Sequence, residues 1–558
     1  MKKKSLLLCM AAVMLTSTIS ADNYYVKTSG ASMNTGASWE DPITLDAALS
    51  IAQTATNDVI HIAAGTYAPT IQILSDATDL TDRDKTFEIN KNITLIGGYP
   101  ADATTGAVAD PQNNVTIFSG DIGSEVKVYH TMVITAPPVV GQKVSINGIS
   151  IKNGKADGIG GITTTKNNFV MNRNLAGGVC VIKSTVEFVD CNIAENTANM
   201  GAALTTLSYA NVTLNRCNVV SNTTNGNGTL YINSPYATDN GTDYAYLTIY
   251  DSNISDNSLP TGTGSGLYTY QFCKVYIHSS TISNNTASAG NSGAYLREGC
   301  LGYIINSTIH GNTASGRGGL FLYSSASKKC TFDVINTTIT ANTGVNTGGL
   351  EISNYSTTNT YNSIISGNAD ASKEYRPISG STSSLKNVTV SDKVYDNVGA
   401  EISGVSFENS TIGSLTDNGG NTKTCLISGA ENPAKTYGMT AAQLTTLASS
   451  FVPAIESNII TKDQVGNSRS ESTTMGAIIK SNDISTINSV VSQTRNIWSQ
   501  DGTLFVETTL GEDITVYSIS GINLHSESAK GGVTMLSPLS KGIYVVKIGN
   551  EVLKAIVR

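Results

Sequence analysis

Three residues that can exchange protons or hold charge occupy the same position in successive copies of a repeated sequence motif. Asp190, Arg216 and Asp251 each stand directly before a small side chain that begins a short apolar segment. On neighbouring coils of a stacked fold, this order would align an acid, a base and an acid. Carboxylate pairs hydrolyse glycosidic bonds, and carboxylate-bound calcium with a basic residue supports proton abstraction from polysaccharides. The same order is also typical of a surface ion-pair ladder, which contributes little stability.

The residues that follow in this row are neutral. Ser279, Asn306 and Asn336 occupy the equivalent position in the next repeats, so the row contains no acidic cluster for calcium. The five histidines are scattered without metal-ligand spacing, and no phosphate-binding glycine loop or nucleophile elbow is present. The sequence therefore predicts no metal centre and no cofactor, and Asp190, Arg216 and Asp251 remain the weaker, catalytic alternative.

A second row combines aromatic residues with an arginine. Aligning the repeats on a recurring glycine puts two parallel columns on the outward side of the strands: Tyr231, Tyr268, Tyr295 and Phe321 in one, and Tyr270, Arg297 and Tyr323 two positions on. Sugar rings stack on aromatic faces, and tyrosine adds a hydroxyl for hydrogen bonding. The two columns therefore predict a ligand-binding platform for a glycan. The alternative is an aromatic ladder that stabilises an exposed sheet through contacts between strands.

A sequence repeat along the middle of the chain predicts the fold that would position these two rows of side chains. Seven asparagines, 26 to 35 residues apart, close the same phrase of alternating apolar residues, a small residue and another apolar residue: Asn196, Asn222, Asn257, Asn285, Asn312, Asn342 and Asn368. A fixed period of this length with two-residue alternation is typical of a stacked β-solenoid. Glycine and asparagine are expected at corners with positive φ, and stacked asparagines can bond along the axis.

Composition and charge limit the class of protein to which the chain can belong and the partners that it can bind. The chain has 558 residues, 52 of them glycine, with 14% charged residues and a net charge of −8. That charge disfavours nucleic acid, whose binding proteins carry clustered Lys and Arg. Residues 1–21 combine a basic start, a short apolar core and small residues, which is typical of a secretory signal peptide. No later segment is apolar enough for a transmembrane helix, so we expect an exported protein.

The seven cysteines beyond the signal segment do not form a disulfide framework, because their number is odd and they are widely scattered. Cys191 and Cys217 occupy equivalent positions of adjacent repeats, which would place their Cα atoms about 4.8 Å apart. That separation permits a disulfide. We nevertheless expect buried thiols, because serine and threonine fill the same position in later repeats.

Pattern changes divide the chain into six segments. Residues 22–170 predict irregular first coils with an N-terminal cap, in which Thr44–Thr54 has helical spacing. Regular coils are expected over 171–410 and a closing region over 411–480. The Ser- and Asn-rich stretch 481–500 is predicted to be a linker, and 501–558 a separate small β domain.

Several motifs resemble those of secreted right-handed parallel β-helix proteins of Gram-negative bacteria, including the polymorphic outer-membrane proteins. They are the opening Tyr24-Tyr25-Val26, the Ala63–Tyr67 run, Ser119-Gly120-Asp121 and the Gly-Gly and Asn repeats. Leu415–Thr424, Asn432-Pro433-Ala434, Asp463–Arg469 and Met475-Gly476-Ala477 are similar to the closing region of such helices. The resemblance covers residues 22–480. It implies a right-handed β-helix, a fold whose members include polysaccharide lyases and hydrolases.

The C-terminal segment resembles the sorting domains of type IX secretion. Ser520-Gly521, Lys541-Gly542-Ile543-Tyr544 and the final Arg558 carry that likeness. The Pro-Asn-Pro that opens such domains is missing, and Asn496-Ile497-Trp498-Ser499 stands in its place. The resemblance implies that secretion machinery engages residues 501–558. It also implies a location at the cell surface or outer membrane of a Gram-negative bacterium.

Taken together, the sequence predicts an all-β, right-handed parallel β-helix with a small β-sandwich-like C-terminal domain. The predicted function is a non-catalytic adhesin or glycan-binding scaffold, whose partner is a polysaccharide or a host surface glycan. A polysaccharide lyase or glycoside hydrolase on the same fold is the first alternative, and a purely structural surface spacer is the second. The lack of a dense acid and base cluster across three neighbouring coils favours binding over catalysis.

Overall fold

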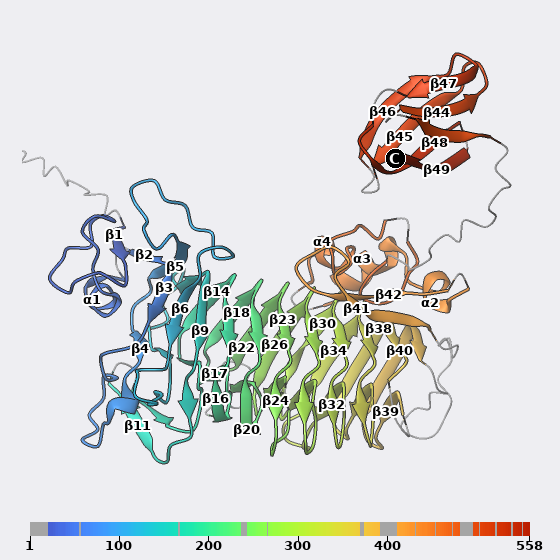
Figure 1. The fold of residues 1–558 in the computed structure, drawn as a ribbon. Coiled ribbons are helices and arrows are strands. Elements are labelled where there is room, and N and C mark those ends of the chain that lie inside the picture. The colour runs from blue at the N-terminus through green and yellow to red at the C-terminus, as the bar shows by residue number, and fades with distance from the viewer. Residues whose placement is uncertain are drawn as a thin grey trace, which may run out of the picture. The chain divides into compact units, whose positions relative to one another are not determined.

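A computed structural model shows that the chain forms a right-handed parallel β-helix followed by a small β domain (Figure 1). The repeat pattern predicted the stacked solenoid, and the family resemblance implied its right hand. Two compact units comprise residues 1–482 and 483–558, and each is described by itself. The structure describes residues 21–557 except 55–56, 166–167, 236–242, 265, 369–372, 391–409, 430, 452–453, 471, 480–494, 501–502, 519–521, 537–538 and 550. Most of the predicted signal peptide and of the predicted linker lies outside the described residues.

Each regular coil contributes four short strands, one to each of four parallel stacks. The first two stacks belong to one 21-stranded sheet. The first stack consists of β1 (Asn23–Val26), β2 (Val59–Ala63), β5 (Thr94–Tyr99), β8 (Val144–Asn147), β14 (Thr185–Val189), β18 (Asn211–Asn215), β22 (Ala245–Tyr250), β26 (Cys273–His278), β30 (Leu301–Ile305), β34 (Thr331–Ile335), β38 (Thr357–Ile365) and β40 (Thr382–Val390). The second consists of β3 (Gly65–Tyr67), β6 (Thr116–Ser119), β9 (Ile149–Lys152), β15 (Asn192–Ala194), β19 (Asn218–Val220), β23 (Asn253–Ser255), β27 (Thr281–Ser283), β31 (Thr308–His310) and β35 (Thr338–Thr340).

The other two stacks close the coil. The third consists of β10 (Lys155–Ala156), β16 (Thr197–Met200), β20 (Thr223–Asn227), β24 (Ser258–Leu259), β28 (Thr286–Ala287), β32 (Thr313–Ala314) and β36 (Thr343–Gly344). The fourth consists of β4 (Phe87–Ile89), β7 (Met132–Ile134), β13 (Val179–Ile182), β17 (Leu204–Leu207), β21 (Leu230–Asn233), β25 (Leu267–Thr269), β29 (Ala294–Arg297), β33 (Leu320–Tyr323), β37 (Leu350–Ile352) and β39 (Tyr375–Pro377).

The inward side chains of these strands form one continuous apolar core along the axis. Val186, Phe188 and Ile193 of one coil belong to it, as do their counterparts Val212, Leu214 and Val219 in the next coil and most counterparts in the later ones. At the N-terminal end, α1 (Leu45–Ile51) packs Leu45 and Ala48 into the same core, and Thr44 caps the helix. This helix confirms the helical spacing seen in the sequence. A 3-10 turn (Asp82–Asp84) and the hairpin of β11 (Gly161–Thr164) and β12 (Phe169–Asn172) complete the N-terminal part.

The repeated asparagines form a ladder parallel to the axis. Each side-chain amide donates a hydrogen bond to the Oδ1 of the next, over 2.8–3.1 Å, from Asn196 through to Asn368. Each Oδ1 also accepts the backbone N–H of the asparagine before it. The predicted stacking of these asparagines is therefore confirmed, and it pairs buried polar backbone at every coil.

Positive φ occurs at other residues than the sequence suggested. The residue before each ladder asparagine adopts the left-handed region, as Glu195 (φ 58°), Ser221 (φ 56°) and Ala341 (φ 57°) show. The recurring glycines are required for a different reason, which is the close approach of the next coil. A Cβ on Gly178 would lie 2.5 Å from the carbonyl oxygen of Ala203 in the next coil, and one on Gly349 would lie 2.2 Å from that of Glu374.

The cysteines are buried thiols, as expected. All seven described cysteines are free, and Cys191 and Cys217 each donate from Sγ to backbone carbonyl oxygens. Cys191 is bonded in this way to Ile146, over 3.3 Å. The pair therefore fills the small-residue position that serine takes in Ser252 and Ser280.

The segment predicted to close the helix lies along its outer face. It comprises the antiparallel pair β41 (Ile412–Thr416) and β42 (Thr424–Ile427), followed by α2 (Pro433–Thr436), α3 (Ala441–Ser449) and α4 (Ser457–Ile460). Leu444, Ala448 and Ile460 pack on the outward side chains of Ile305 and Ile335, in the first stack. Figure 1 shows these helices over the ends of β30, β34 and β38.

The C-terminal unit contains two antiparallel sheets that share one apolar core. One has the order β43 (Ile497–Gln500), β44 (Thr503–Thr508) and β47 (Gly532–Leu536). The other has the order β46 (Asn523–Ser528), β45 (Asp513–Ser518), β48 (Gly542–Ile548) and β49 (Glu551–Val557). Leu504, Val516 and Val546 are fully buried between them, which gives the β-sandwich-like arrangement predicted for this domain.

Candidate functional site

The aromatic columns predicted from the sequence lie on the fourth stack. Parallel register pairs Tyr231 with Tyr268, Tyr268 with Tyr295, and Tyr295 with Phe321. The ring centroids of consecutive members are 5.7, 5.3 and 4.9 Å apart. Because the alternate residues Leu230, Leu267 and Leu320 belong to the core, this inner column faces away from it, as expected from the alternation.

Most of the inner column is covered. Tyr231, Tyr268 and Phe321 are 6%, 1% and 4% exposed. Glycine turns lie against the two tyrosines, and the Arg317 guanidinium lies 4.3 Å from the ring centroid of Phe321. Burial raises the pKa of Tyr231 and Tyr295, so their hydroxyl groups stay protonated. These rings support the surface from beneath. A direct role of the inner column in binding stays a prediction.

The outer column is the accessible part of this surface. Tyr270 is 40% exposed and Tyr323 is 37% exposed, two coils apart, and Arg297 lies between them. The Arg297 guanidinium is 5.4 Å from the ring centroid of Tyr270 and 5.2 Å from that of Tyr323. We call Tyr270, Arg297 and Tyr323 the tyrosine–arginine surface.

Arg297 is held by tyrosines rather than by an acid. Its guanidinium also lies 5.8 Å from the ring of Tyr268 and 5.5 Å from that of Tyr295, and it donates to the Tyr268 hydroxyl. Within the described part of the chain, Arg297 forms no ion pair, and its buried Nε has no hydrogen-bond partner. By contrast, Arg317 in the next coil is paired with the buried carboxylate of Glu351 at 2.7 Å.

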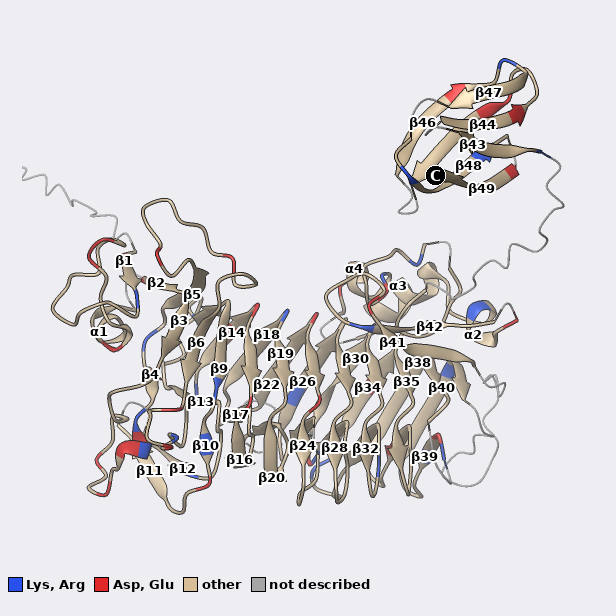
Figure 2. Ribbon diagram, viewed as in Figure 1, with Lys and Arg blue, Asp and Glu red and all other residues tan. Residues whose placement is uncertain are grey.

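The charged row lies elsewhere, at the turns between the first and second stacks. Asp190, Arg216 and Asp251 have φ of 52°, 52° and 46°, so each occupies the left-handed position that links its two strands. The structure thus brings the three predicted residues into one row on neighbouring coils. Figure 2 shows acidic and basic residues alternating at the turns after β14, β18 and β22.

Within this row the two carboxylates differ. Arg216 makes a two-point ion pair with Asp190, at 2.7 and 2.8 Å, and both side chains are about two-fifths exposed. Asp251 has no such partner within salt-bridge distance among the described residues. Burial raises its pKa, and a hydrogen bond from Asn421 and the charge of Arg216 partly offset that effect. Asp251 is therefore the carboxyl group of this row that can hold a proton most readily.

Beyond Asp251, the residues of this row contact the closing segment instead of solvent. Asn306 donates to the carbonyl of Ile459 at 2.7 Å, and Asn336 donates to that of Ile460 at 2.8 Å. These amides anchor the closing segment, which covers the later coils and leaves the earlier ones open. Sequence reasoning missed this arrangement, because no local pattern places residues 415–466 beside coils that lie over a hundred positions earlier.

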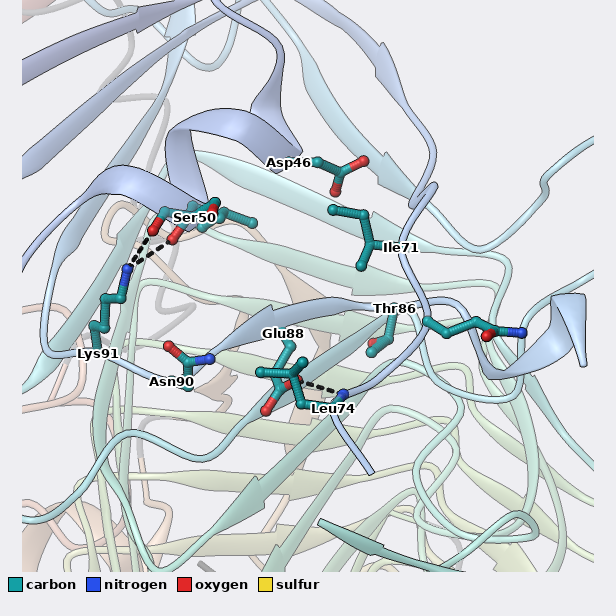
Figure 3. Close-up of a pocket in the computed structure, with 10 residues that line it drawn as sticks. Asp46, Ser50, Ile71, Leu74, Thr86, Glu88, Asn90 and Lys91 are labelled. Atoms are coloured by element: carbon teal, nitrogen blue, oxygen red, sulfur yellow. Dashed lines mark hydrogen bonds between the residues drawn. The ribbon is translucent and has the colours of Figure 1, made fainter. Parts of the chain in front are cut away.

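A separate pocket of about 290 Å³ lies beside α1 and β4 (Figure 3). Lys91 donates to the carbonyl of Ser50 at 2.6 Å, and the backbone N–H of Leu74 donates to Glu88 at 2.9 Å. Burial raises the pKa of Asp46 on the helix side. No sequence pattern predicts this pocket, because its walls come from three separate segments.

Neither a metal site nor a membrane-spanning helix is found in the described part of the chain. No three His, Cys, Asp or Glu side chains among these residues are grouped so that they could hold a metal ion. No helix of the described chain is long and apolar enough to cross a bilayer. His130 and His278 are buried, and burial lowers the pKa of each to about 4.

Comparisons with known proteins add little to this description. No protein-family model matches the chain, and no curated protein is similar to it at a significant level. Among solved structures, the pectate lyase Pel9A is similar over 75% of this chain and 94% of its own, with 14% sequence identity and a TM-score of 0.37.

Proposed function

We propose that this chain is a non-catalytic glycan-binding protein that acts as an adhesin or surface scaffold. The observation that carries the proposal is the tyrosine–arginine surface. Its two exposed rings, Tyr270 and Tyr323, lie two coils apart, about 10 Å along the axis. Sugar rings can stack on such faces while tyrosine hydroxyls donate hydrogen bonds.

The arginine between the rings favours an acidic glycan. Arg297 carries a charge that no carboxylate of the described chain neutralises within ion-pair distance, and the rings of four tyrosines lie around it. A guanidinium recognises carboxylate, sulfate or phosphate groups with planar, directed hydrogen bonds. We therefore expect uronate-containing or sulfated polysaccharides to bind more tightly than neutral ones at this surface.

The scaffold supports such binding because it is rigid. Tyr268 and Tyr295 pack beneath the outer column, and their coils are held by parallel strand pairing and by the asparagine ladder. A side chain that is already fixed loses little conformational entropy when a ligand binds. A chain that is only a spacer would place no requirement on the identity of Tyr270, Arg297 or Tyr323.

The experiment compares variants of the full chain against acidic and neutral polysaccharides, with and without calcium. Binding is followed by co-elution in gel filtration, which also reports the size of the polymer. We expect intact acidic chains that co-elute, and two- to tenfold weaker binding for Tyr270→Ala and Tyr323→Ala, as stacking of about 0.5–1.5 kcal/mol implies. Tyr437→Ala removes an exposed tyrosine elsewhere and should bind as the original chain does. Equal binding by all variants would exclude this surface.

A second candidate function is cleavage of a polysaccharide at Asp190, Arg216 and Asp251. The raised pKa of Asp251 favours it, because a general acid must hold a proton near the working pH. Against it, Asp190 is engaged by Arg216 and is not a free base. Shortened polymers in the gel-filtration experiment that persist in Tyr270→Ala but disappear in Asp251→Asn would establish catalysis here.

Export and surface delivery belong to the same proposal. Residues 1–21 would direct secretion, and residues 501–558 would act as the sorting domain that secretion machinery engages at the outer membrane. The support is the sequence resemblance of both segments, together with the separate compact fold of the C-terminal unit. Deleting residues 501–558 should abolish surface exposure of the β-helix in a bacterium with type IX secretion. Unchanged surface labelling would refute the sorting role.

A further inference from the structure

Three adjoining hollows form a groove over the second stack and the turns that precede it, on a different sheet from the tyrosine–arginine surface. Their volumes are about 440, 360 and 350 Å³. Asn218 lines both the first and the second hollow, and Gly420 and Asn421 line both the second and the third. The hollows therefore adjoin one another at these residues, and between the second and the third the closing segment bonds to the sheet through Thr422 and Lys423.

The groove has a regular floor and two walls from distant segments. Asn192, Asn218, Asn253 and Thr281, the first residues of β15, β19, β23 and β27, line the floor. Residues 109–115 form one wall, and residues 415–423 with 458–466 form the other. From Ser150 on β9 to Thr281 on β27, the floor crosses five coils, a length of about 19 Å. The third hollow lies beside the turns of Asp251, Ser279 and Asn306.

The third hollow contains a buried polar atom without a partner. His278 lines it, is 3% exposed, and its buried Nδ1 makes no hydrogen bond. Its ring stacks on Tyr250, with centroids 4.6 Å apart, and Tyr250 lines the same hollow. A buried polar atom without a partner is rare in folded proteins, because leaving one unpaired costs about 1–3 kcal/mol. Here a ligand hydroxyl would supply the missing bond.

The charges of the groove disfavour an acidic ligand. Its cations are Arg216, Lys423 and Lys462, and Arg216 is already paired with Asp190. The remaining carboxylates outnumber the unpaired cations, and they are Asp110, Asp251, Asp256, Asp417 and Asp463. A polymer with a negative charge on every unit would therefore be repelled along most of this length.

We propose that this groove is a second binding site, which takes a neutral linear polysaccharide. Amide and hydroxyl side chains repeat at each coil, and that spacing is close to the length of one sugar unit in an extended chain. Tyr250 offers an aromatic edge or face for a ring, and Asp251, Asn421 and His278 offer hydrogen-bond partners beside it. The site is independent of the acidic glycan proposed for Arg297.

A peptide fits this groove less well. An extended peptide binds by adding a strand to an open sheet edge. The floor strands β15, β19, β23 and β27 are paired on both sides within the stack, so they offer no such edge. Apolar pockets for alternate side chains are also missing among the described lining residues, which are mostly polar.

The test uses isothermal titration of the full chain with cellohexaose and mannohexaose, their trisaccharides, hexagalacturonate and oligolysine. Asn218→Trp places a large ring where the first two hollows meet. Asn211→Trp is the matched control, because Asn211 is an exposed first residue of β18 and lines none of the three hollows. Thermal melting of both variants checks that the helix is intact.

We expect a neutral hexasaccharide to bind at least tenfold more tightly than its trisaccharide. Asn218→Trp should weaken it at least tenfold, and Asn211→Trp and Arg297→Gln should leave it unchanged. Binding of hexagalacturonate should respond to Arg297→Gln and not to Asn218→Trp, so failure of either site is seen separately. The proposal is overturned if neither neutral hexasaccharide binds, if Asn218→Trp has no effect, or if only oligolysine binds in a way that Asn218→Trp removes.

Discussion

Replacing one rung of the asparagine ladder tests whether the ladder holds adjacent coils together. Asn285→Ala removes two bonds that the amide donates, to Ile254 O and to Asn312 Oδ1, each over 2.9 Å. It also removes the acceptor for the backbone N–H and the side-chain amide of Asn257, at 3.2 and 2.9 Å. The Asn257 amide keeps its bond to Val219 O, whereas its backbone N–H loses the acceptor on Asn285.

The expected loss is about 2–6 kcal/mol, because four hydrogen bonds are lost and each contributes about 0.5–1.5 kcal/mol. In a stacked repeat protein, stability is spread over neighbouring coils, so a local measurement is more informative than a single midpoint. Hydrogen exchange of peptides covering β23 to β31 should accelerate by about 30-fold to about 20,000-fold, because 1.4 kcal/mol is about tenfold.

The matched control is Asn211→Ala, which removes an exposed asparagine that makes no side-chain hydrogen bond among the described residues. Its exchange should change by less than a few fold. Exchange in Asn285→Ala that stays within the range of this control would refute the ladder as a source of stability. Acceleration spread evenly over all coils would instead show that opening is global.

Three further predictions follow from buried groups and from the exposed rings. Because burial lowers the pKa of His130 and His278 to about 4, the unfolded chain binds more protons than the folded one between about pH 4 and 6.5. Stability should therefore fall as the pH drops from 7 to 4, by up to about 3 kcal/mol for each histidine, and His278→Gln should flatten that dependence in thermal melts. Reductant should leave the melting temperature unchanged, because all seven cysteines are free thiols; a clear decrease would contradict this. Tyr323→Phe should retain most of the acidic-glycan binding that Tyr323→Ala loses, if the ring face rather than the hydroxyl makes the contact.

The repeat pattern predicted the fold because it is local and periodic. Alternating apolar residues predict the strands, and the fixed asparagine position predicts how the repeats stack. The ladder from Asn196 to Asn368 confirms the stacking. The backbone conformation at the corners was not predicted correctly. Glycine and asparagine both tolerate positive φ, yet Gly178 and Gly349 are required by close approach of the next coil instead.

The candidate sites were predicted in part. Repeat alignment put Tyr270, Arg297 and Tyr323 in one column, and Asp190, Arg216 and Asp251 in another, because register follows from the period. Burial of Tyr231 and Tyr268 could not be predicted, since it depends on turns contributed by adjacent coils. The walls of the groove were also missed, because the contact between residues 415–466 and earlier coils depends on long-range packing.

The central claim is that Arg297 and its neighbouring tyrosines bind an acidic glycan, and Arg297→Gln tests it most directly. Isothermal titration of the full chain and of this variant would use hexagalacturonate and a sulfated oligosaccharide at low and high salt. A hydrogen bond to a charged group contributes about 1.5–3 kcal/mol, so we predict that Arg297→Gln binds about 10- to 150-fold more weakly and loses salt sensitivity. Equal affinity of the variant and the original chain for both ligands would contradict the account.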